Sequence, residues 1–475
     1  MNRIWTWLLL LFAGSLAVSA LLNFSAHAPA GLEEAIGHRL PLSSVVPFIL
    51  MLLAIALVPL FAPYWWEENR NKAMIAGGLA LPVFFLFLQL EMGSHALWNV
   101  THEFFSFLVL LGALFTISGG IHLRGDLKAT PWTNTGFLAA GGILASLIGT
   151  TGASMLLIRP LLSTNREREH TRHVFLFFLF LVANAGGLLT PLGDPPLFLG
   201  FLRGVPFFWT LHLWKEWLFM MGALLALFYF LDQSAYRKEN PAHRLADQVI
   251  YEPLRLSGHA HLFLLGGVVA VVIFAHGPHT WMREPALVGL AALSYGMDLQ
   301  RRKGSQAAFC PRLANRFNFH PIVEVAVLFA GIFITMLPAL CLLKARGSEL
   351  GITRPWHFFW MSGLLSSFLD NAPTYATFFA LGQGLASQQG LCQTTAGLGG
   401  CVAQTGVPWP LLEAISLGSV LMGANTYIGN APNFMIKTIV EQSGVKMPSF
   451  FGYMAYAGMV LFPAYLFITF FFLQR

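Results

Sequence analysis

Two aspartates lie in apolar surroundings, where a carboxylate can bind a proton or a cation. Asp194 stands in the run Thr190-Pro191-Leu192-Gly193-Asp194-Pro195-Pro196, and Asp370 stands in Leu369-Asp370-Asn371-Ala372-Pro373-Thr374. Burying a carboxylate is costly unless it is paired, protonated or bound to a cation. Asp194 also suits the N-cap of a helix that begins at Pro195. Capping and cation binding are compatible, so both interpretations stay open.

Neutral oxygens and amides gather in two other runs, 149–154 and 423–433. Such groups suit weak, reversible Na+ coordination or hydrogen bonds to a carboxylate ligand. The alternative is that they only satisfy backbone groups left free by a broken helix. The candidate ion- or substrate-binding residues are Thr150, Thr151, Gly152, Ser154, Thr190, Gly193, Asp194, Pro195, Asp370, Asn371, Thr374, Asn425, Thr426, Asn430 and Asn433.

Two basic residues, Arg159 and Lys437, fall within apolar segments close to these runs. Each could pair with an aspartate, bind an anionic substrate as a counter-charge, or extend to the membrane interface. The sequence contains no motif for a nucleotide, a cofactor or a catalytic residue set. We therefore expect Na+ and H+ as the transported or coupling ions and no metal beyond Na+.

The composition requires a membrane environment. Only 11% of the residues are charged, 56% are hydrophobic, and the mean hydropathy is +0.63. Such a chain cannot cover itself with polar surface, which predicts one large polytopic domain. The net charge of +6 could suggest a nucleic-acid partner. We exclude that partner because the basic residues lie in short loops between apolar segments, where they indicate topology.

Twelve apolar segments follow the N-terminal segment 1–28, and not all of them are simple spans. The runs 134–162 and 357–383 carry polar tips at their middles and are predicted to be re-entrant hairpins. The runs 174–202 and 408–440 contain Pro and Gly, through which no helix can continue unbroken. Non-helical backbone at membrane depth lines a cavity or is enclosed by protein, so these breaks mark a site. Simple spans are expected at 43–62, 74–90, 105–119, 214–231, 261–276, 285–297, 320–343 and 450–473.

The order of elements repeats along the chain: three spans, a hairpin, a broken helix and a closing span. Counting basic residues in the loops places one hairpin on each side of the membrane. This predicts an all-α fold of two inverted repeats, with the site at the repeat interface near the midplane. The predicted parts are a signal peptide or first transmembrane helix at 1–28, a first repeat at 29–231, a cytoplasmic linker at 232–260 and a second repeat at 261–475.

Two local features leave alternatives open. The segment from Arg3 to Ala28 has the three-part pattern of a cleavable secretory signal, and it also fits an uncleaved first helix. Cys392 and Cys401 could join in a disulfide across one loop, although the four cysteines form no CxxC motif.

At the level of motifs, the chain resembles the ion transporter superfamily. This group includes divalent anion:sodium symporters, citrate transporters and one branch of sodium:proton antiporters. The resemblance rests on the runs Ile148-Gly149-Thr150-Thr151-Gly152-Ala153-Ser154-Met155-Leu156-Leu157-Ile158-Arg159-Pro160 and Thr190-Pro191-Leu192-Gly193-Asp194-Pro195-Pro196-Leu197-Phe198-Leu199-Gly200. They look like those of a bacterial subgroup labelled citrate transporter or sodium:proton antiporter. The resemblance implies substrate and Na+ sites at the hairpin tips and breaks, an elevator-like or rocking motion, and a homodimer.

The sequence departs from the dicarboxylate pattern of Ser-Asn-Thr at both hairpin tips. Asp194 replaces the threonine usual before the proline pair, and the pair Asp370-Asn371 looks like the antiporter branch. Two carboxylates would repel a multiply charged anion. We therefore predict a Na+/H+ antiporter of the bacterial inner membrane rather than an enzyme.

Two other functions remain as alternatives. The first is a Na+- or H+-coupled transporter of citrate or another small carboxylate, with Arg159 or Lys437 as the counter-charge. The second is an intramembrane aspartyl protease, which would use Asp194 and Asp370 as its catalytic pair. The sequence before Asp194 is Pro191-Leu192-Gly193 rather than the Gly-x-Gly that such a protease requires.

Overall fold

Apolar length determines which segments become long helices. In the computed structural model, which describes residues 31–243, 252–275, 277–303, 309–315, 317–393 and 400–474, seven helical segments are long and apolar enough to cross a membrane. The prediction of an all-α polytopic membrane protein is confirmed. The predicted signal peptide or first helix at 1–28 lies outside the described residues.

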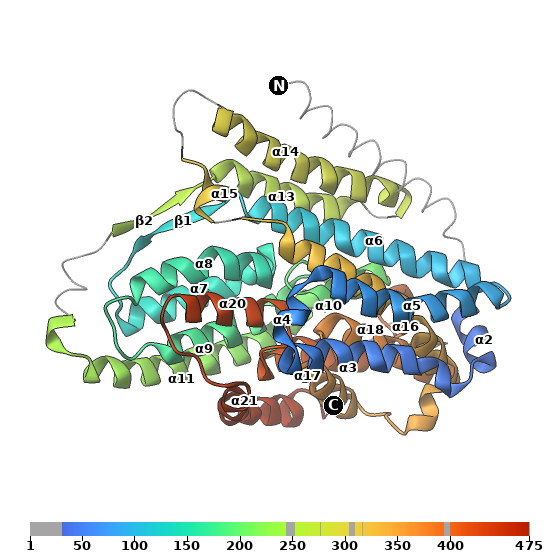
Figure 1. The fold of residues 1–475 in the computed structure, drawn as a ribbon. Helices are drawn as coiled ribbons and strands as arrows, with labels where there is room; N and C mark the ends of the chain where they lie inside the picture. The colour runs from blue at the N-terminus through green and yellow to red at the C-terminus, as the bar shows by residue number, and fades with distance from the viewer. Residues whose placement is uncertain are drawn as a thin grey trace.

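The long spans of both halves pack against one another in one bundle (Figure 1). The bundle consists of α3 (Val46–Phe61), α5 (Asn69–Gln89), α6 (Gly93–Ser118), α13 (His259–Phe274), α14 (Arg283–Lys303) and α16 (His320–Arg346). Within it, α16 contacts α3, α5 and α6, while α6 also contacts α13 and α14. The short α2 (Leu32–Arg39) packs on α16.

Several spans are longer than their apolar cores. The helix expected at 105–119 begins at Gly93, and the helix expected at 214–231 continues to Lys238 as α11 (Trp214–Lys238). Polar residues at these ends include Thr101, whose hydroxyl donates to the Leu97 carbonyl within the helix. A hydropathy pattern marks the apolar part of a helix, and hydrogen bonding carries the helix beyond it.

Both predicted hairpins are helix pairs. The first comprises α7 (Pro131–Ile148) and α8 (Thr150–Thr164), and the second comprises α17 (Pro355–Phe368) and α18 (Asn371–Gln389). Proline occupies the first turn of α7 and of α17, where its missing N–H costs nothing. Most residues of the polar tips named from the sequence form the first turns of α8 and α18.

Both predicted broken helices are interrupted by a 3-10 turn and a short extended stretch. The first comprises α9 (Arg172–Leu181), η2 (Ala185–Leu189) and α10 (Pro195–Leu202), and α11 closes that half. The second comprises α19 (Trp409–Leu421), η8 (Met422–Asn425) and α20 (Ala431–Gln442), and α21 (Phe450–Phe471) closes the chain. The order of elements is thus the same in both halves, while their inverted orientation stays a prediction.

The short helix after the break of each half packs against the hairpin of the other half. The first-half α10 packs on the second-half hairpin helix α18, and the second-half α20 packs on the first-half α8 (Figure 1). This packing brings the break of each half close to the hairpin tip of the other half.

One two-stranded sheet lies outside the helical architecture and was not expected. Strand β1 (His122–Asp126) pairs antiparallel with β2 (Glu252–Ser257), with Leu123 opposite Leu256. Strand β2 lies within the segment 232–260 that was predicted as a linker, and the end of α11 occupies the start of that segment. The division of the chain into two repeats stays a prediction. The remaining short elements are η1 (Leu42–Val45), α4 (Pro63–Glu67), η3 (Phe207–Leu213), η4 (Gly277–Met282), α15 (Pro311–Ala314), η5 (Gly347–Leu350), η6 (Leu391–Gln393) and η7 (Ala403–Thr405).

Candidate functional site

Four helices begin at the same place in the middle of the molecule. The residues at these starts are Thr150 of α8, Asn371 of α18, Asp194 before α10 and Asn430 before α20. Their side chains are joined by hydrogen bonds. The start of a helix carries unsatisfied N–H groups and partial positive charge. The arrangement therefore favours negative charge at its centre.

The Asp194 carboxylate occupies that centre and is 1% exposed. It accepts a hydrogen bond from the Thr150 hydroxyl at 3.0 Å and one from the Asn430 amide at 3.3 Å. The Asn371 amide donates to its other oxygen. Three donors from both hairpins and the opposite break thus stabilise the ionised carboxylate. Asp194 occupies the N-cap position of α10, but its side chain makes no capping hydrogen bond.

Glycines permit the close approach of the first break and the first hairpin. Gly149 has a backbone φ of +82° between α7 and α8, a conformation that favours glycine. A Cβ at Gly193 would lie 2.1 Å from the Gly187 carbonyl oxygen, so the turn admits no side chain there. The Thr150 N–H then donates to the Gly193 carbonyl at 2.8 Å. This backbone contact fixes the hairpin tip beside Asp194.

A relay of amides continues from Asp194 into the second break. Asn430 also donates to the Ala183 carbonyl at 2.9 Å and to the Asn184 side chain at 3.2 Å. Asn184 in turn donates to the Asn433 side-chain oxygen at 2.9 Å. All three amides are buried. The relay joins the two breaks directly, although the residues are far apart in the sequence.

Thr190 and Thr426 have the same role in the two halves. The Thr190 hydroxyl donates to the Ser146 carbonyl of the first hairpin, and the Thr426 hydroxyl donates to the Ser367 carbonyl of the second. Each hydroxyl also accepts an N–H from two residues further on, at 3.2 Å in both halves. These contacts agree with the interpretation that they satisfy backbone groups at the breaks.

Asp370 has a more local environment than Asp194. Its carboxylate accepts the Ala372 N–H at 3.1 Å and so caps α18, and its side chain is only partly buried. The Thr374 hydroxyl donates to its backbone carbonyl at 3.1 Å. Because Asn371 follows it directly, the second carboxylate lies one residue from a donor to Asp194.

Other predicted site residues lie in the first turns of the helices that meet at this centre. Pro195 opens α10, Thr151 and Gly152 lie in the first turn of α8, and Ser154 follows them. The Ser154 hydroxyl oxygen and the Asn371 side-chain oxygen are buried and have no hydrogen-bond partner in the described part of the chain. Two oxygens are therefore available to a small ligand near the helix starts.

Asn425 and Lys437 contact other residues, and Arg159 lies further along α8. The Asn425 amide donates to the Ser367 hydroxyl at 2.8 Å and its oxygen accepts from Tyr465 at 3.1 Å. Lys437 pairs with Glu441 at 2.8 Å within α20. Arg159 lies partly buried in α8, more than two turns beyond Thr150.

Sequence reasoning missed two groups of residues. Asn184 is a lone polar residue in the apolar run 174–189, and that position was a signal that could have identified it. The second group is a buried charge network in which Asp232 accepts from Arg168 at 2.6 Å and 3.2 Å and contacts His173 at 2.8 Å. Nothing in the linear pattern pairs these residues.

The disulfide left open by the sequence is present. Cys392 and Cys401 are joined, with their Cα atoms 5.2 Å apart. The bond closes the loop between α18 and α19, where Cys401 also forms an isolated antiparallel bridge with Pro408.

Comparison with known proteins identifies the family to which this architecture corresponds. A family model described as "Putative citrate transport" matches residues 37–473. The match spans both hairpins, both broken helices and every residue around Asp194. A search of curated proteins finds no significant match to the sequence.

Proposed function

The chain belongs to this citrate transport family of membrane proteins, and on that premise we propose that it exchanges Na+ for H+ at Asp194. Membership of the family supports secondary transport rather than an enzymatic activity. The protein would then draw its energy from an ion gradient across the bacterial inner membrane.

The observation that carries the proposal is the position of the Asp194 carboxylate among four helix starts. Helix N-termini attract anions, and here the protein supplies the anion itself. A fixed carboxylate in a buried setting binds either a proton or a small cation, and it cannot bind both at once. Competition for one carboxylate is sufficient to couple two opposed fluxes.

The neighbouring side chains can support both occupied states. With Asp194 ionised, Thr150, Asn371 and Asn430 donate to it as observed. When a Na+ ion binds, rotation of the Asn371 side chain would present its oxygen, which has no hydrogen-bond partner in the described residues, to the ion. Neutral oxygens of this kind bind Na+ weakly and release it readily.

Asp370 supplies the second negative charge of the proposal. It lies at the start of α18 and precedes Asn371, so a cation approaching Asp194 from the second hairpin passes close to it. Its capping bond occupies one carboxylate oxygen. We assign it a role in attracting the cation, with Asp194 as the group that exchanges the proton.

The family description favours a second candidate, Na+- or H+-coupled transport of citrate or a related carboxylate. The helix starts would then contribute their partial positive charge to an anionic substrate. In the present geometry Asp194 already occupies the place where such an anion would gain most. A substrate carboxylate would have to bind elsewhere or displace it.

The experiment that tests the proposal measures the pH gradient in proteoliposomes containing the purified full-length protein. Na+, Li+ and K+ are added in turn while a pH-sensitive dye reports the gradient. We expect Na+ to collapse the gradient with the natural protein and with Glu91→Gln, an exposed carboxylate paired with Arg39. We expect no response with Asp194→Asn.

Two outcomes would overturn the proposal. A Na+ response that persists in Asp194→Asn would remove the proposed carrier group. Absence of a response together with Na+-driven uptake of labelled citrate or succinate would establish the second candidate and make Arg159 the next residue to test.

A further inference from the structure

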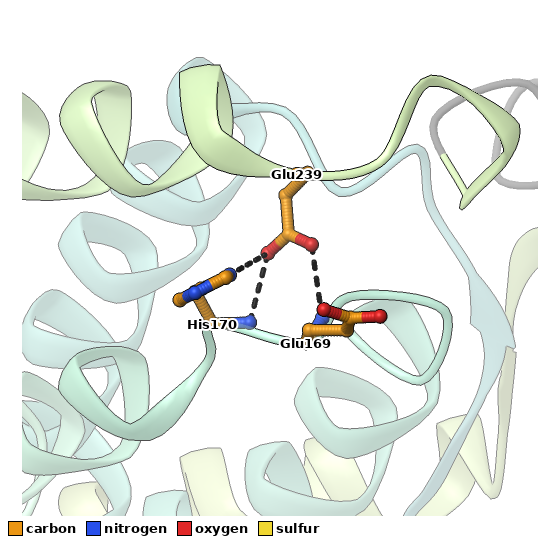
Figure 2. Close-up of side chains that lie close together, drawn as sticks. All are labelled: Glu169, His170 and Glu239. Carbon is orange, nitrogen blue, oxygen red and sulfur yellow. Dashed lines mark hydrogen bonds and ion pairs between the residues drawn. The ribbon is translucent and has the colours of Figure 1, made fainter.

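A second cluster of ion-binding side chains lies outside the membrane-spanning helices. It joins the connection between α8 and α9 to the residues that follow α11. Glu169 and His170 come from the connection, and Glu239 follows directly after α11 (Figure 2). One ligand atom from each of the three lies within 4.8 Å of the others.

A fourth ligand-type group reaches the same cluster. His243 lies four residues beyond Glu239, and its Nδ1 is 3.4 Å from a carboxylate oxygen of Glu169. On the other side, Nδ1 of His170 is 3.5 Å from a carboxylate oxygen of Glu239. The cluster thus contains two imidazoles and two carboxylates, arranged as two nitrogen–oxygen pairs of nearly equal length.

The three ligand atoms of Glu169, His170 and Glu239 lie close enough together to share one metal ion. With Zn–N and Zn–O bonds of about 2.1 Å and tetrahedral angles, adjacent ligand atoms lie about 3.4 Å apart. A direct hydrogen bond between the same atoms would be shorter, about 2.9 Å. Nδ1 of His243 is buried and makes no hydrogen bond within the described residues.

Glu239 is held in place by the backbone of the connection. Its two carboxylate oxygens accept the N–H groups of Glu169 at 3.0 Å and His170 at 2.8 Å (Figure 2). Carboxylates that bind metal are commonly oriented by such outer hydrogen bonds.

The charge balance of the cluster also favours a cation. Arg168 lies 3.6 Å from Glu239 and is the nearest positive charge, but it forms two hydrogen bonds with the buried Asp232. Asp232 balances the charge of Arg168. Glu169 and Glu239 therefore give the cluster a net charge of two negative charges when the histidines are neutral. Glu169 and His170 are half exposed, so an ion can enter from solvent.

We propose that Glu169, His170 and Glu239 form a binding site for a divalent transition-metal ion of the zinc class, which His243 beside Glu169 would complete. A mixed nitrogen and oxygen ligand set with two histidines suits Zn2+ or Co2+ and does not suit Mg2+, which prefers oxygen and octahedral geometry. The bound ion fastens the α8–α9 connection to the end of α11. This site is independent of the ion that the protein transports.

The test uses the purified full-length protein in detergent, freed of any affinity tag and of bound metal. Co2+ is titrated while its visible absorption is recorded, because tetrahedral Co2+ absorbs far more strongly than the hydrated ion. Zn2+ and Mg2+ are compared in thermal unfolding. We expect one equivalent of Co2+ to give the tetrahedral spectrum, Zn2+ to displace it, and Zn2+ but not Mg2+ to raise the unfolding temperature.

Single-ligand variants locate the binding. His170→Gln and His243→Gln should each weaken Co2+ binding at least about tenfold, whereas His95→Gln, an exposed histidine of α6, should leave it unchanged. His170 is half exposed, so its variant should fold and unfold as the metal-free natural protein does. An octahedral Co2+ spectrum, or binding that is unchanged in both ligand variants, would overturn the proposal.

Discussion

The two breaks have the same backbone frame and different charge. Thr190 and Thr426 hold equivalent hairpin carbonyls, and the same number of residues separates each from the residue before its short helix. That residue is Asp194 in the first half and Asn430 in the second. The aspartate accepts hydrogen bonds, and the asparagine donates one to it.

The hairpin tips also differ in charge, but here the charged residue belongs to the second half. Gly149 precedes α8 in the first half, whereas the charged Asp370 precedes α18 in the second. The two carboxylates therefore occupy different elements: one lies in the break of the first half and the other at the hairpin tip of the second half. A repeated frame positions the groups, and the places where the repeat departs from symmetry carry the charge on which the proposed exchange depends.

The largest decrease in Na+/H+ exchange is expected when the charge difference between the two breaks is removed. Asp194→Asn makes the two breaks alike and removes the carboxylate to which we assign proton exchange. We expect Na+/H+ exchange in proteoliposomes to fall at least about 100-fold, equivalent to about 2.7 kcal/mol. Adding Asn430→Asp to that variant should not restore exchange, because position 430 faces the Ala183 carbonyl and would repel a carboxylate. Recovered exchange in the double variant would contradict this account of the breaks.

Removing one donor should shift the pH dependence. Asn371→Ala deletes a hydrogen bond to the ionised Asp194, which is worth about 1.5–3 kcal/mol. A less stabilised carboxylate holds its proton to higher pH, so half-maximal exchange should move upward by about one unit or more. Asn425→Ala removes an amide that bonds to Ser367 and Tyr465 instead, and it should leave the pH profile in place. Equal shifts in both variants would indicate a general loss of packing.

The second carboxylate should matter less than the first. Asp370→Asn keeps a capping side chain at the start of α18, so the helix should form as before. Only the charge is lost, and Asp370 is less buried than Asp194. We expect exchange to decrease about 5- to 10-fold, or about 1 kcal/mol, measured as the initial rate against Na+ concentration. A loss as large as that of Asp194→Asn would show that the two carboxylates act as one unit.

The smallest effect is expected at Lys437. It pairs with Glu441 one turn away in α20, and such pairs contribute about 0.3–0.5 kcal/mol. Lys437→Gln should change exchange by less than about twofold. A large decrease, accompanied by loss of citrate-dependent transport, would instead support the role of counter-charge to an anionic substrate.

Much of the architecture could be predicted because its signals are local. The prolines after Gly193 and Gly429 lie in the first turns of α10 and α20, and positive φ at Gly149 gives the hairpin turn. Asp194 and the three residues that donate to it were all candidates from the sequence. These side chains come together because α10 and α20 each pack against the hairpin of the other half. No local sequence pattern encodes that packing.

The residues that were missed are joined by long-range contacts. Asn184 reaches Asn433 across 249 positions, and Arg168 reaches Asp232 across 64. Each pairing follows from how helices pack, and either residue alone is compatible with many partners. The disulfide between Cys392 and Cys401 was left open for a different reason, since a short separation permits a bond without requiring one.

The central claim is that protons and Na+ compete for Asp194. Binding of radioactive Na+ to the purified protein, measured across a range of pH at fixed Na+ concentration, tests it without the complications of transport. The account predicts that bound Na+ increases as pH rises, because deprotonation restores the charge, and that Asp194→Asn binds none at any pH. Na+ binding that is independent of pH, or that survives in Asp194→Asn, would contradict it.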